Sequence, residues 1–321
     1  MKILITGGAG FIGSHLAEKL LQEGYSVICL DNFNTYYDPE IKRQNIIKAQ
    51  SFPHFHLVEG DILDKELLLT LFEKHAFDKV VHLAARAGVR PSIQHPLLYE
   101  KVNVQGTIHL LDRCRESGVA KFIFASSSSV YGANPKVPFA ETDSVDHPIS
   151  PYAATKKAGE LICYTYHQLY DISVSCMRFF TVYGPRQRPD MAIHKFTRLI
   201  DQGEEVPIFG SGHSRRDYTF YTDIVQGLYH AMLSCDGYHI YNLGESKTVE
   251  LLYLIRLIEK ALRKKAKLDH KPEQPGDVPI TYADISTAKK EISYDPRVPI
   301  EEGIPIFVEW FKKHSCINRS F

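Results

Sequence analysis

Residues 2–13 read Lys-Ile-Leu-Ile-Thr-Gly-Gly-Ala-Gly-Phe-Ile-Gly, and this stretch decides the fold. A short apolar strand runs into a glycine turn that satisfies G-x-G-x-x-G through Gly8, Gly10 and Gly13, and G-x-x-G-x-x-G from Gly7. Glycine permits a positive φ and lets the backbone approach a pyrophosphate at the N-terminus of the following helix. A strand before the turn and a helix after it predict a dinucleotide-binding site.

Outward from this turn, the first half of the chain alternates short apolar runs with amphipathic stretches. Continuous apolar strands separated by helices are typical of a parallel sheet that is covered on both faces. We therefore predict an α/β fold, a doubly wound Rossmann sheet of six or seven strands, with the cofactor-binding domain over residues 1–180. The expected strands are residues 2–6, 26–30, 55–59, 79–84, 121–125 and 172–179, and the expected helices are 11–23, 39–49, 65–74, 97–117 and 151–169.

After about residue 180 the pattern changes, because prolines and glycines interrupt the alternation, and Tyr, Arg and Asp gather in the loops. Helical patterns return at residues 193–202, 222–233, 249–263 and 301–313. We predict a smaller α/β substrate-binding domain over residues 181–321, with some segments returning to the first domain.

Asp31 ends the second expected strand, 18 residues after Gly13. A carboxylate at this place accepts hydrogen bonds from the adenosine ribose and repels a 2′-phosphate. Asn32 and Phe33 follow, with no adjacent Arg to receive that phosphate, so the sequence predicts NAD as the cofactor. Asp61 follows the third strand and either caps the next helix or hydrogen-bonds the adenine amine; both alternatives stay open at this point.

Tyr152 and Lys156 are four residues apart and therefore share one face of a helix. An ordinary Tyr, with a pKa of about 10, is a poor base at neutral pH. We expect the neighbouring ammonium and a positive nicotinamide ring to lower the pKa of Tyr152 into a useful range. The alternative is a surface pair, since Y-x-x-x-K is common on helices.

Four consecutive serines, Ser126 to Ser129, end the fifth expected strand. Serines there are costly unless they line a polar cleft, and ligands of open α/β sheets bind at the carboxyl ends of the strands. We predict that Ser127 or Ser129 hydrogen-bonds a sugar hydroxyl, whose proton passes to Tyr152.

Bulk composition narrows the class of protein. The 321 residues carry 38 Lys plus Arg and 38 Asp plus Glu, and this formal net charge of zero disfavours a nucleic-acid partner. The chain has no apolar run near the ~20 residues of a membrane span and no signal-peptide pattern, so we expect no membrane partner and a cytoplasmic location. The six scattered cysteines are expected to be reduced and buried. The 15 histidines show no ligand spacing, so no metal site is predicted.

The motifs together resemble the extended short-chain dehydrogenase/reductases, in an order and spacing that cover essentially the whole chain. The resemblance rests on the glycine turn, Asp31, Leu83-Ala84-Ala85, Asn103, the serine run with Val130-Tyr131-Gly132, and the Tyr152/Lys156 pair. It implies that Lys156 also holds the nicotinamide ribose. The cofactor-binding residues that it implies are Gly7, Gly10, Phe11, Ile12, Gly13, Asp31, Asn32, Asp61, Ile62, Leu83, Ala84, Ala85, Asn103, Tyr152 and Lys156.

The resemblance also suggests the reaction. Ser127 and Ser129 match the catalytic serine of UDP-galactose 4-epimerases and its nearby Ser or Thr, so Ser127, Ser129, Tyr152 and Lys156 are the expected catalytic residues. Similar dehydratases carry Asp-Glu where this chain has Ser128-Ser129, and similar decarboxylases carry Glu at Ser129. Without those carboxylates, we expect oxidation at C4, turnover of the 4-keto sugar, and return of hydride with NAD kept bound.

Several stretches are similar to the UDP-glucuronate 4-epimerase branch: residues 31–38, 87–90, 145–148, 181–191 and 274–278. UDP-galactose 4-epimerases usually have Asn at Thr181 and Arg at Gln274. A sugar carboxylate needs hydroxyl or cationic donors, and Thr181 and Arg188 can provide them, with Arg90 or Arg86 as further candidates. The expected substrate-binding residues are Arg90, Ser127, Ser128, Tyr152, Thr181, Arg188, Met191, Arg216 (for the diphosphate) and Asp277.

Alternatives stay open. The substrate is UDP-glucose or UDP-N-acetylglucosamine if the loop around Arg188 does not serve a carboxylate, and Arg186 and Arg188 are then solvated loop charges. A non-catalytic NAD-binding regulator and an ordinary dehydrogenase are the other hypotheses. The resemblance further implies a homodimer, in which residues 97–117 and 151–169 form a four-helix interface with a second subunit.

Overall fold

The computed structural model describes residues 1–272 and 278–314. Within these residues, a seven-stranded sheet has the order β11-β6-β5-β4-β1-β2-β3, and all its neighbouring strands are parallel. The doubly wound α/β fold predicted from the sequence is confirmed. The strands are β1 (Lys2–Thr6), β2 (Ser26–Asp31), β3 (Phe55–Glu59), β4 (Lys79–His82), β5 (Lys121–Ser127), β6 (Ser173–Phe179) and β11 (Tyr238–Leu243).

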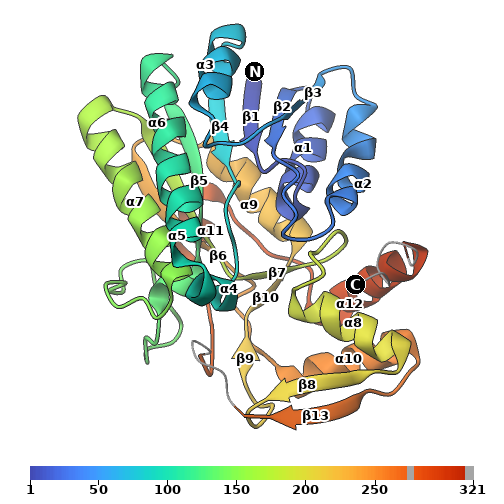
Figure 1. Cartoon of the computed structure of the whole chain (residues 1–321). Helices are drawn as coiled ribbons and strands as arrows, with labels where there is room; N and C mark the ends of the chain where they lie inside the picture. The colour runs from blue at the N-terminus through green and yellow to red at the C-terminus, as the bar shows by residue number, and fades with distance from the viewer. Residues whose placement is uncertain (273–277, 315–321) are drawn as a thin grey trace.

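Helices cover both faces of the sheet (Figure 1). Successive side chains of a strand point to opposite faces, so Ile3 and Ile5 pack into one core and Leu4 into the other. The Leu4 side is covered by α3 (Lys65–Lys74), α6 (Gly106–Glu116) and α7 (Pro151–Tyr170), and the Ile3 side by α1 (Phe11–Gln22), α2 (Pro39–Gln50), α9 (Tyr221–Leu233) and α11 (Ser286–Ile292).

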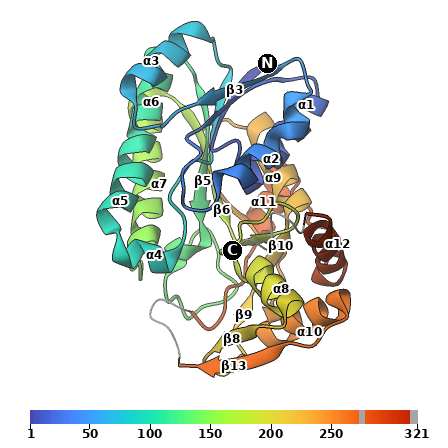
Figure 2. The same ribbon diagram turned by 45° about the vertical axis from the view of Figure 1, so that its right-hand side comes forward.

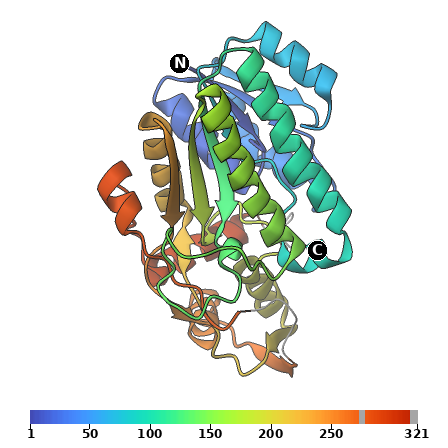
Figure 3. The same cartoon turned by 90° about the vertical axis from the view of Figure 1, so that its left-hand side faces the viewer.

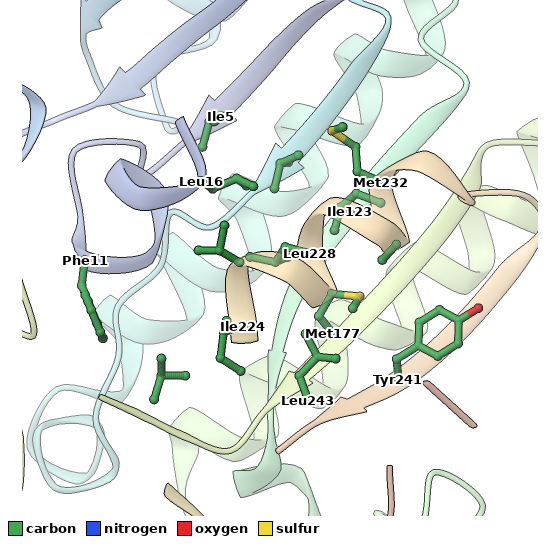
Figure 4. Packing of buried hydrophobic residues seen from close by; sticks show 14 of the residues in the cluster. Ile5, Phe11, Leu16, Ile123, Met177, Ile224, Leu228, Met232, Tyr241 and Leu243 are labelled. Atoms are coloured by element: carbon green, nitrogen blue, oxygen red, sulfur yellow. The ribbon is translucent and has the colours of Figure 1, made fainter. Parts of the chain in front are cut away.

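Helix α9 comes from the second half of the chain but packs against this sheet (Figure 4). Its Ile224 and Leu228 are almost fully buried, as is Met177 of β6. β11 also lies in the sheet, beside β6. The expected boundary near residue 180 stays a prediction, with α9 and β11 as segments that return to the first part.

The segment predicted as one helix over residues 97–117 is composite. It consists of α5 (Pro96–Glu100), the π-helical turn η1 (Lys101–Gln105) and α6, and a short helix α4 (Val89–Gln94) that the sequence pattern did not predict precedes it. In Figure 3, α6 and α7 lie side by side on one face of the sheet.

Most of the remaining described elements form a smaller lobe beside the carboxyl ends of the strands (Figure 2). Its own apolar core includes Ile193, Ile208 and Phe307. Its elements are β7 (Thr181–Tyr183), α8 (Ala192–Gln202), β8 (Glu205–Phe209), β9 (Arg215–Arg216), β10 (Tyr218–Phe220), β12 (Val249–Glu250), α10 (Leu251–Leu262), β13 (Lys267–Lys271) and α12 (Ile300–Lys313).

The strand order places a switch point between β1 and β4. From β1 the chain winds outward through β2 and β3, and then returns to place β4 on the other side of β1. In open α/β sheets, ligands bind outside the carboxyl ends of the strands at such a point. The small lobe lies over the same edge, so the fold places a binding site between the two.

Candidate active site

A cavity of about 400 Å³ opens at this edge of the sheet, within the range of small-molecule sites. Residues at or just after the carboxyl ends of six of the strands line it. They include Gly7 after β1, Asp31 at the end of β2, Leu83 after β4, Ser127 at the end of β5 and Phe180 after β6. The cavity therefore joins the glycine turn, the serine run and the predicted Tyr152/Lys156 pair.

The glycine turn has the close packing that a phosphate-binding loop needs. Gly7 has a φ of +69°, and a Cβ atom there would lie 2.7 Å from the backbone nitrogen of Ala84. A Cβ atom on Gly13 would lie 2.3 Å from the carbonyl oxygen of Gly7. Gly10 is the N-cap of α1 and offers no side-chain cap, so the first N–H groups of the helix can donate to a ligand. These features fit a dinucleotide pyrophosphate.

Asp31 is buried and already holds three donors. Its Oδ1 accepts from the N–H of Phe33 at 3.0 Å and from Lys42 Nζ at 2.9 Å, and its Oδ2 accepts from the N–H of Ala9 at 3.2 Å. A carboxylate has about four acceptor sites, which leaves one for a ribose hydroxyl. Lys42, in the first half of α2, also lines the cavity, and the sequence reasoning missed it.

Asn32 and Asp61, both predicted to bind the cofactor, contact each other. Asn32 Nδ2 donates to Asp61 Oδ2 at 2.8 Å, and both residues line the cavity. Asp61 Oδ1 accepts from the N–H of Leu63 at 2.9 Å. The helix-capping alternative for Asp61 is wrong, because Asp64 is the N-cap of α3 and accepts from the N–H of Leu67.

The loop after β4 brings Leu83, Ala84 and Ala85 to the cavity. Other parts of the chain contribute the predicted lining residues Phe11, Ile12, Ile62 and Met191. Asn103 does not line the cavity but binds the backbone of this loop. It is buried, its Oδ1 accepts from the N–H of Arg86 at 2.7 Å, and its Nδ2 donates to the Arg86 carbonyl at 3.0 Å and to Thr155 Oγ1 at 3.1 Å. Asn103 therefore ties the loop to α7.

Tyr152 lies in the first turn of α7, which starts at a well-formed cap. Ser150 accepts from the N–H of Ala153 at 3.2 Å, and Pro151 occupies the first helical position. The Tyr152 side chain hydrogen-bonds Ser127, and both line the cavity. Burial raises the pKa of Tyr152, while the Ser127 hydrogen bond and the charge of Arg188 act to lower it. In the protein alone the pKa of Tyr152 is raised, because desolvation of the phenol outweighs both. The predicted lowering also needs the positive nicotinamide ring and stays a prediction.

Lys156 lies one turn further along α7 and lines the cavity. It is 4% exposed, and its Nζ donates to the carbonyl oxygen of Ala125 at 2.7 Å. Burial lowers the pKa of Lys156 to about 8. The ammonium group is therefore still mostly protonated near neutral pH, as a partner for a ribose hydroxyl or a phenolate must be.

A cluster of charged and aromatic side chains closes another side of the cavity. Arg188 binds Asp190 through Nε at 2.9 Å and through Nη2 at 2.8 Å. The guanidinium carbons of Arg86 and Arg188 lie 5.7 and 5.6 Å from the centre of the Tyr36 ring. Tyr36, Arg86 and Arg188 all line the cavity, so its wall carries two guanidinium groups.

Other predicted residues lie elsewhere in the described part of the chain. Ser128, Ser129, Thr181, Arg90 and Arg216 do not line the cavity. The N–H of Ser129 donates to Ser127 Oγ at 3.1 Å, and the N–H of Thr181 donates to the Asp217 carbonyl. The guanidinium carbon of Arg90 lies 4.6 Å from the centre of the Phe209 ring, and Arg216 lies in β9. Asp277 and Gln274 are outside the described residues, and the roles of all these residues stay predictions.

Several lining residues were not among the predicted site residues, and they include Tyr36, Tyr37 and Lys42. The signal for the tyrosines was their place a few residues after Asp31 and Asn32, in a loop that starts at the carboxyl end of β2. The signal for Lys42 was weaker, since a Lys on an amphipathic helix is usually solvated. Arg86 was only an alternative to Arg90, and the structure places it in the cavity lining.

The described residues hold neither a cluster of metal ligands nor a helix suited to a membrane. No group of three or more His, Cys, Asp and Glu side chains in residues 1–272 and 278–314 is placed to hold a metal ion. In the same part of the chain, none of the helices combines the length and apolar character required to traverse a bilayer. Cys29, Cys114, Cys163, Cys176 and Cys235 are free and buried, as predicted for these five.

Comparisons with known proteins agree with this geometry. A family model described as GDP-mannose 4,6 dehydratase matches residues 4–307. The UDP-glucuronate 4-epimerase of Thermodesulfobacterium geofontis is 43% identical over 318 residues, which cover 99% of this chain and 98% of that protein. The solved UDP-glucuronic acid 4-epimerase of Bacillus cereus, in complex with UDP-glucuronic acid and NAD, has a TM-score of 0.92 and 36% identity, covering 98% of this chain and 99% of that chain. The Thermotoga maritima UDP-glucose 4-epimerase with UDP-glucose has a TM-score of 0.90 and 36% identity over the same shares.

Proposed function

Since the chain belongs to the family described as GDP-mannose 4,6 dehydratase, we propose that it is an NAD-dependent UDP-sugar 4-epimerase that interconverts UDP-glucuronate and UDP-galacturonate. The observation that carries this proposal is the meeting of Tyr152, Ser127 and Arg188 in the cavity that also holds the glycine turn. Dehydration is disfavoured, because Ser128 and Ser129 stand where the similar dehydratases have an acid and a base.

Each side chain of the site has its own role in the proposed reaction at C4. Ser127 orients the C4 hydroxyl of the sugar, and Tyr152 takes its proton and later returns it. Lys156 would hold a ribose hydroxyl of the cofactor, and its positive charge favours the Tyr152 phenolate. When bound, NAD would supply both the hydride acceptor and the hydride donor for C4, so no external oxidant is needed. The turn from Gly7 to Gly13 and the carboxylate of Asp31 would hold the cofactor's pyrophosphate and ribose.

Preference for a uronic acid is supported by Arg86 and Arg188, since guanidinium groups bind carboxylates through paired hydrogen bonds. The B. cereus neighbour crystallised with UDP-glucuronic acid supports the same choice. UDP-glucose is the second candidate, because Asp190 already occupies Nε and Nη2 of Arg188 and a neighbour binds UDP-glucose.

The test is a panel assay with purified protein and UDP-glucuronate, UDP-glucose and UDP-N-acetylglucosamine at equal concentration. Products are separated by chromatography, and NADH is followed by absorbance. We expect UDP-galacturonate to form fastest, without net NADH. Faster turnover of UDP-glucose selects the second candidate, accumulating NADH indicates a dehydrogenase, and a panel without turnover rejects an epimerase.

We also propose a homodimer that forms through α5 and α7. Leu97 of α5 is 81% exposed, and Leu161 and Tyr164 of α7 are 55% and 47% exposed. Apolar side chains that gather on neighbouring helices are typical of an interface between subunits. The expected cytoplasmic location stays a prediction, which cell fractionation tests.

A further inference from the structure

The loop that carries Arg188 is attached to helix α1 by an ion pair. Arg186 Nη2 donates to Glu18 Oε1 at 2.5 Å, and Arg186 Nη1 donates to Ser14 Oγ at 3.2 Å. The side chains of Arg186 and Glu18 are only 17% and 9% exposed. Arg186 is therefore not a solvated loop charge. Resting on the proposed function, we propose that the Arg186–Glu18 pair positions Arg188 against the sugar and so determines the preference for a uronic acid.

The backbone of the loop requires such a support. Arg186 has a φ of +67°, in the left-handed region that side chains with a Cβ atom avoid. It comes two residues before Arg188, so its conformation sets the direction in which the chain enters that position. The buried Gln187 fixes the middle of the loop, with Nε2 donating to the Val182 carbonyl at 2.9 Å and Oε1 accepting from the N–H of His194 at 3.2 Å.

A second contact from α1 holds the same loop. Nε2 of His15 is 2.9 Å from the Pro185 carbonyl oxygen, and the His15 ring lies 3.9 Å from the Tyr221 ring. Burial and then the charge of Arg186 lower the pKa of His15 to about 3. The ring is neutral at working pH and donates its Nε2–H to Pro185, because a carbonyl can only accept.

Both contacts attach the loop that carries Arg188 to α1, the helix that starts at the glycine turn. Ser14, His15 and Glu18 share one side of α1, since residues one turn apart are neighbours on a helix. Glu18 is fixed from its other oxygen by Lys48 of α2, at 2.9 Å from Oε2. The charge of Arg188 in turn acts on Tyr152. One rigid helix therefore links the expected cofactor phosphate site to Arg188, and Arg186 and Glu18 are positioning residues rather than catalytic ones.

The experiment is a double-mutant cycle between Arg186→Ala and Arg188→Gln. Steady-state kinetics with UDP-glucuronate and UDP-glucose is combined with calorimetric binding of UDP-glucuronate to the NAD-loaded protein. We expect Arg186→Ala to raise KM and Kd for UDP-glucuronate about tenfold, to change kcat by less than about twofold, and to leave UDP-glucose nearly unaffected. In the Arg188→Gln background it should add less than about twofold, because coupled residues are non-additive.

Glu18→Gln tests the pair from the helix side and keeps the size of the side chain. Its matched control is Glu23→Gln, which breaks the exposed Lys19–Glu23 pair at the C-terminal end of the same helix. We expect Glu18→Gln to reproduce the selective loss and Glu23→Gln to behave as the wild type. Additive effects, or equal losses for the two sugars, would overturn the positioning role. Wild-type protein that turns over neither sugar would refute the proposed function instead. The binding of UDP-glucuronate in the calorimetric cycle would still test whether the Arg186–Glu18 pair positions Arg188.

Discussion

The guanidinium group of Arg188 binds both carboxylate oxygens of Asp190, with distances of 2.9 Å from Nε and 2.8 Å from Nη2. Burial alone would raise the pKa of Asp190, but the charge and hydrogen bonds of Arg188 outweigh it and hold that pKa below its usual range. Asp190 is therefore ionised at neutral pH. A sugar carboxylate at this place would find an arginine that is already oriented by an internal carboxylate.

Replacement of Arg188 by Gln is expected to shift the pH dependence of turnover. The positive charge of Arg188 acts to lower the pKa of Tyr152, so its removal raises that pKa and moves the acid limb of kcat/KM to higher pH. The KM for UDP-glucuronate should rise about tenfold or more, since a hydrogen bond to a charged group is worth about 1.5–3 kcal/mol. Arg256→Gln, on the exposed side of α10, is the control. An unchanged acid limb would contradict the electrostatic role.

Removal of the Tyr152 hydroxyl should stop the chemistry and leave the cofactor bound. Tyr152→Phe is expected to lower kcat by about 10² to 10⁴, as for loss of a general base. NAD content after purification should match that of the wild type. Tyr164→Phe is the matched control, because Tyr164 lies on the same helix but is 47% exposed. Near-normal turnover by Tyr152→Phe would remove it as the base.

The role of the glycine turn can be tested by comparing Gly7 with Gly24, a glycine outside the turn with a similar backbone conformation. Gly7 and Gly24 both have a positive φ, of +69° and +81°, but a Cβ atom on Gly7 would meet the backbone of Ala84, while one on Gly24 has no atom within 4 Å. Gly24→Ala should lower the free energy of unfolding by about 1–2 kcal/mol and retain NAD. Gly7→Ala should lose NAD as well, because loop 83–85 must move. Thermal melts and cofactor content after purification measure both effects.

Asp217 gives a prediction about stability. It is fully buried and accepts hydrogen bonds from the N–H groups of Glu245, Ser246 and Ala283 and from Thr219 Oγ1. Asp217→Asn replaces one oxygen by an NH₂ group that faces two of these donors. We expect a loss of about 1–3 kcal/mol in the free energy of unfolding.

The same carboxyl makes this loss depend on pH. Burial raises the pKa of Asp217 from 3.8 to about 6, so the folded state binds more protons between these values. Its contribution to stability is complete below about pH 4 and declines as pH rises through about 6. The difference between wild type and Asp217→Asn in urea unfolding should therefore narrow over this interval. A difference that widens would show that the carboxylate is the favoured form.

If the exposed apolar face of α5 and α7 forms the proposed dimer interface, one charged side chain placed in it should prevent dimerisation. Leu161→Glu should convert the proposed dimer to a monomer, because an unpaired carboxylate in an apolar interface is costly. Leu268→Glu, at a 43% exposed leucine of β13, is the control and should leave the assembly unchanged. Light scattering after size-exclusion chromatography measures the mass. A wild-type protein that is already monomeric would refute the dimer.

Sequence patterns predicted the elements whose signals are local. The strands over residues 2–6 and 55–59 and the helix over residues 65–74 have the predicted bounds. The composite α5–η1–α6 was read as one helix, because a π-helical turn changes the hydrogen-bond pattern without changing the apolar spacing. Spacing also placed Tyr152 and Lys156 on one face of α7. It could not predict the pKa of Tyr152, which depends on how deeply that face is buried.

What the sequence determined by itself was the doubly wound sheet, the glycine turn at its edge and the helical Tyr-x-x-x-Lys pair, since each depends on residues within a few positions of one another. Only the tertiary structure decided the partners of the charged side chains: Lys42 on Asp31, and Arg186 on Glu18, which is 168 positions away. Such pairs form when separate elements pack together, and an arginine in a loop has the same local pattern whether it ends in solvent or against a helix. The physical reason is that short-range propensity fixes the elements, whereas burial and charge pairing between distant segments complete the site.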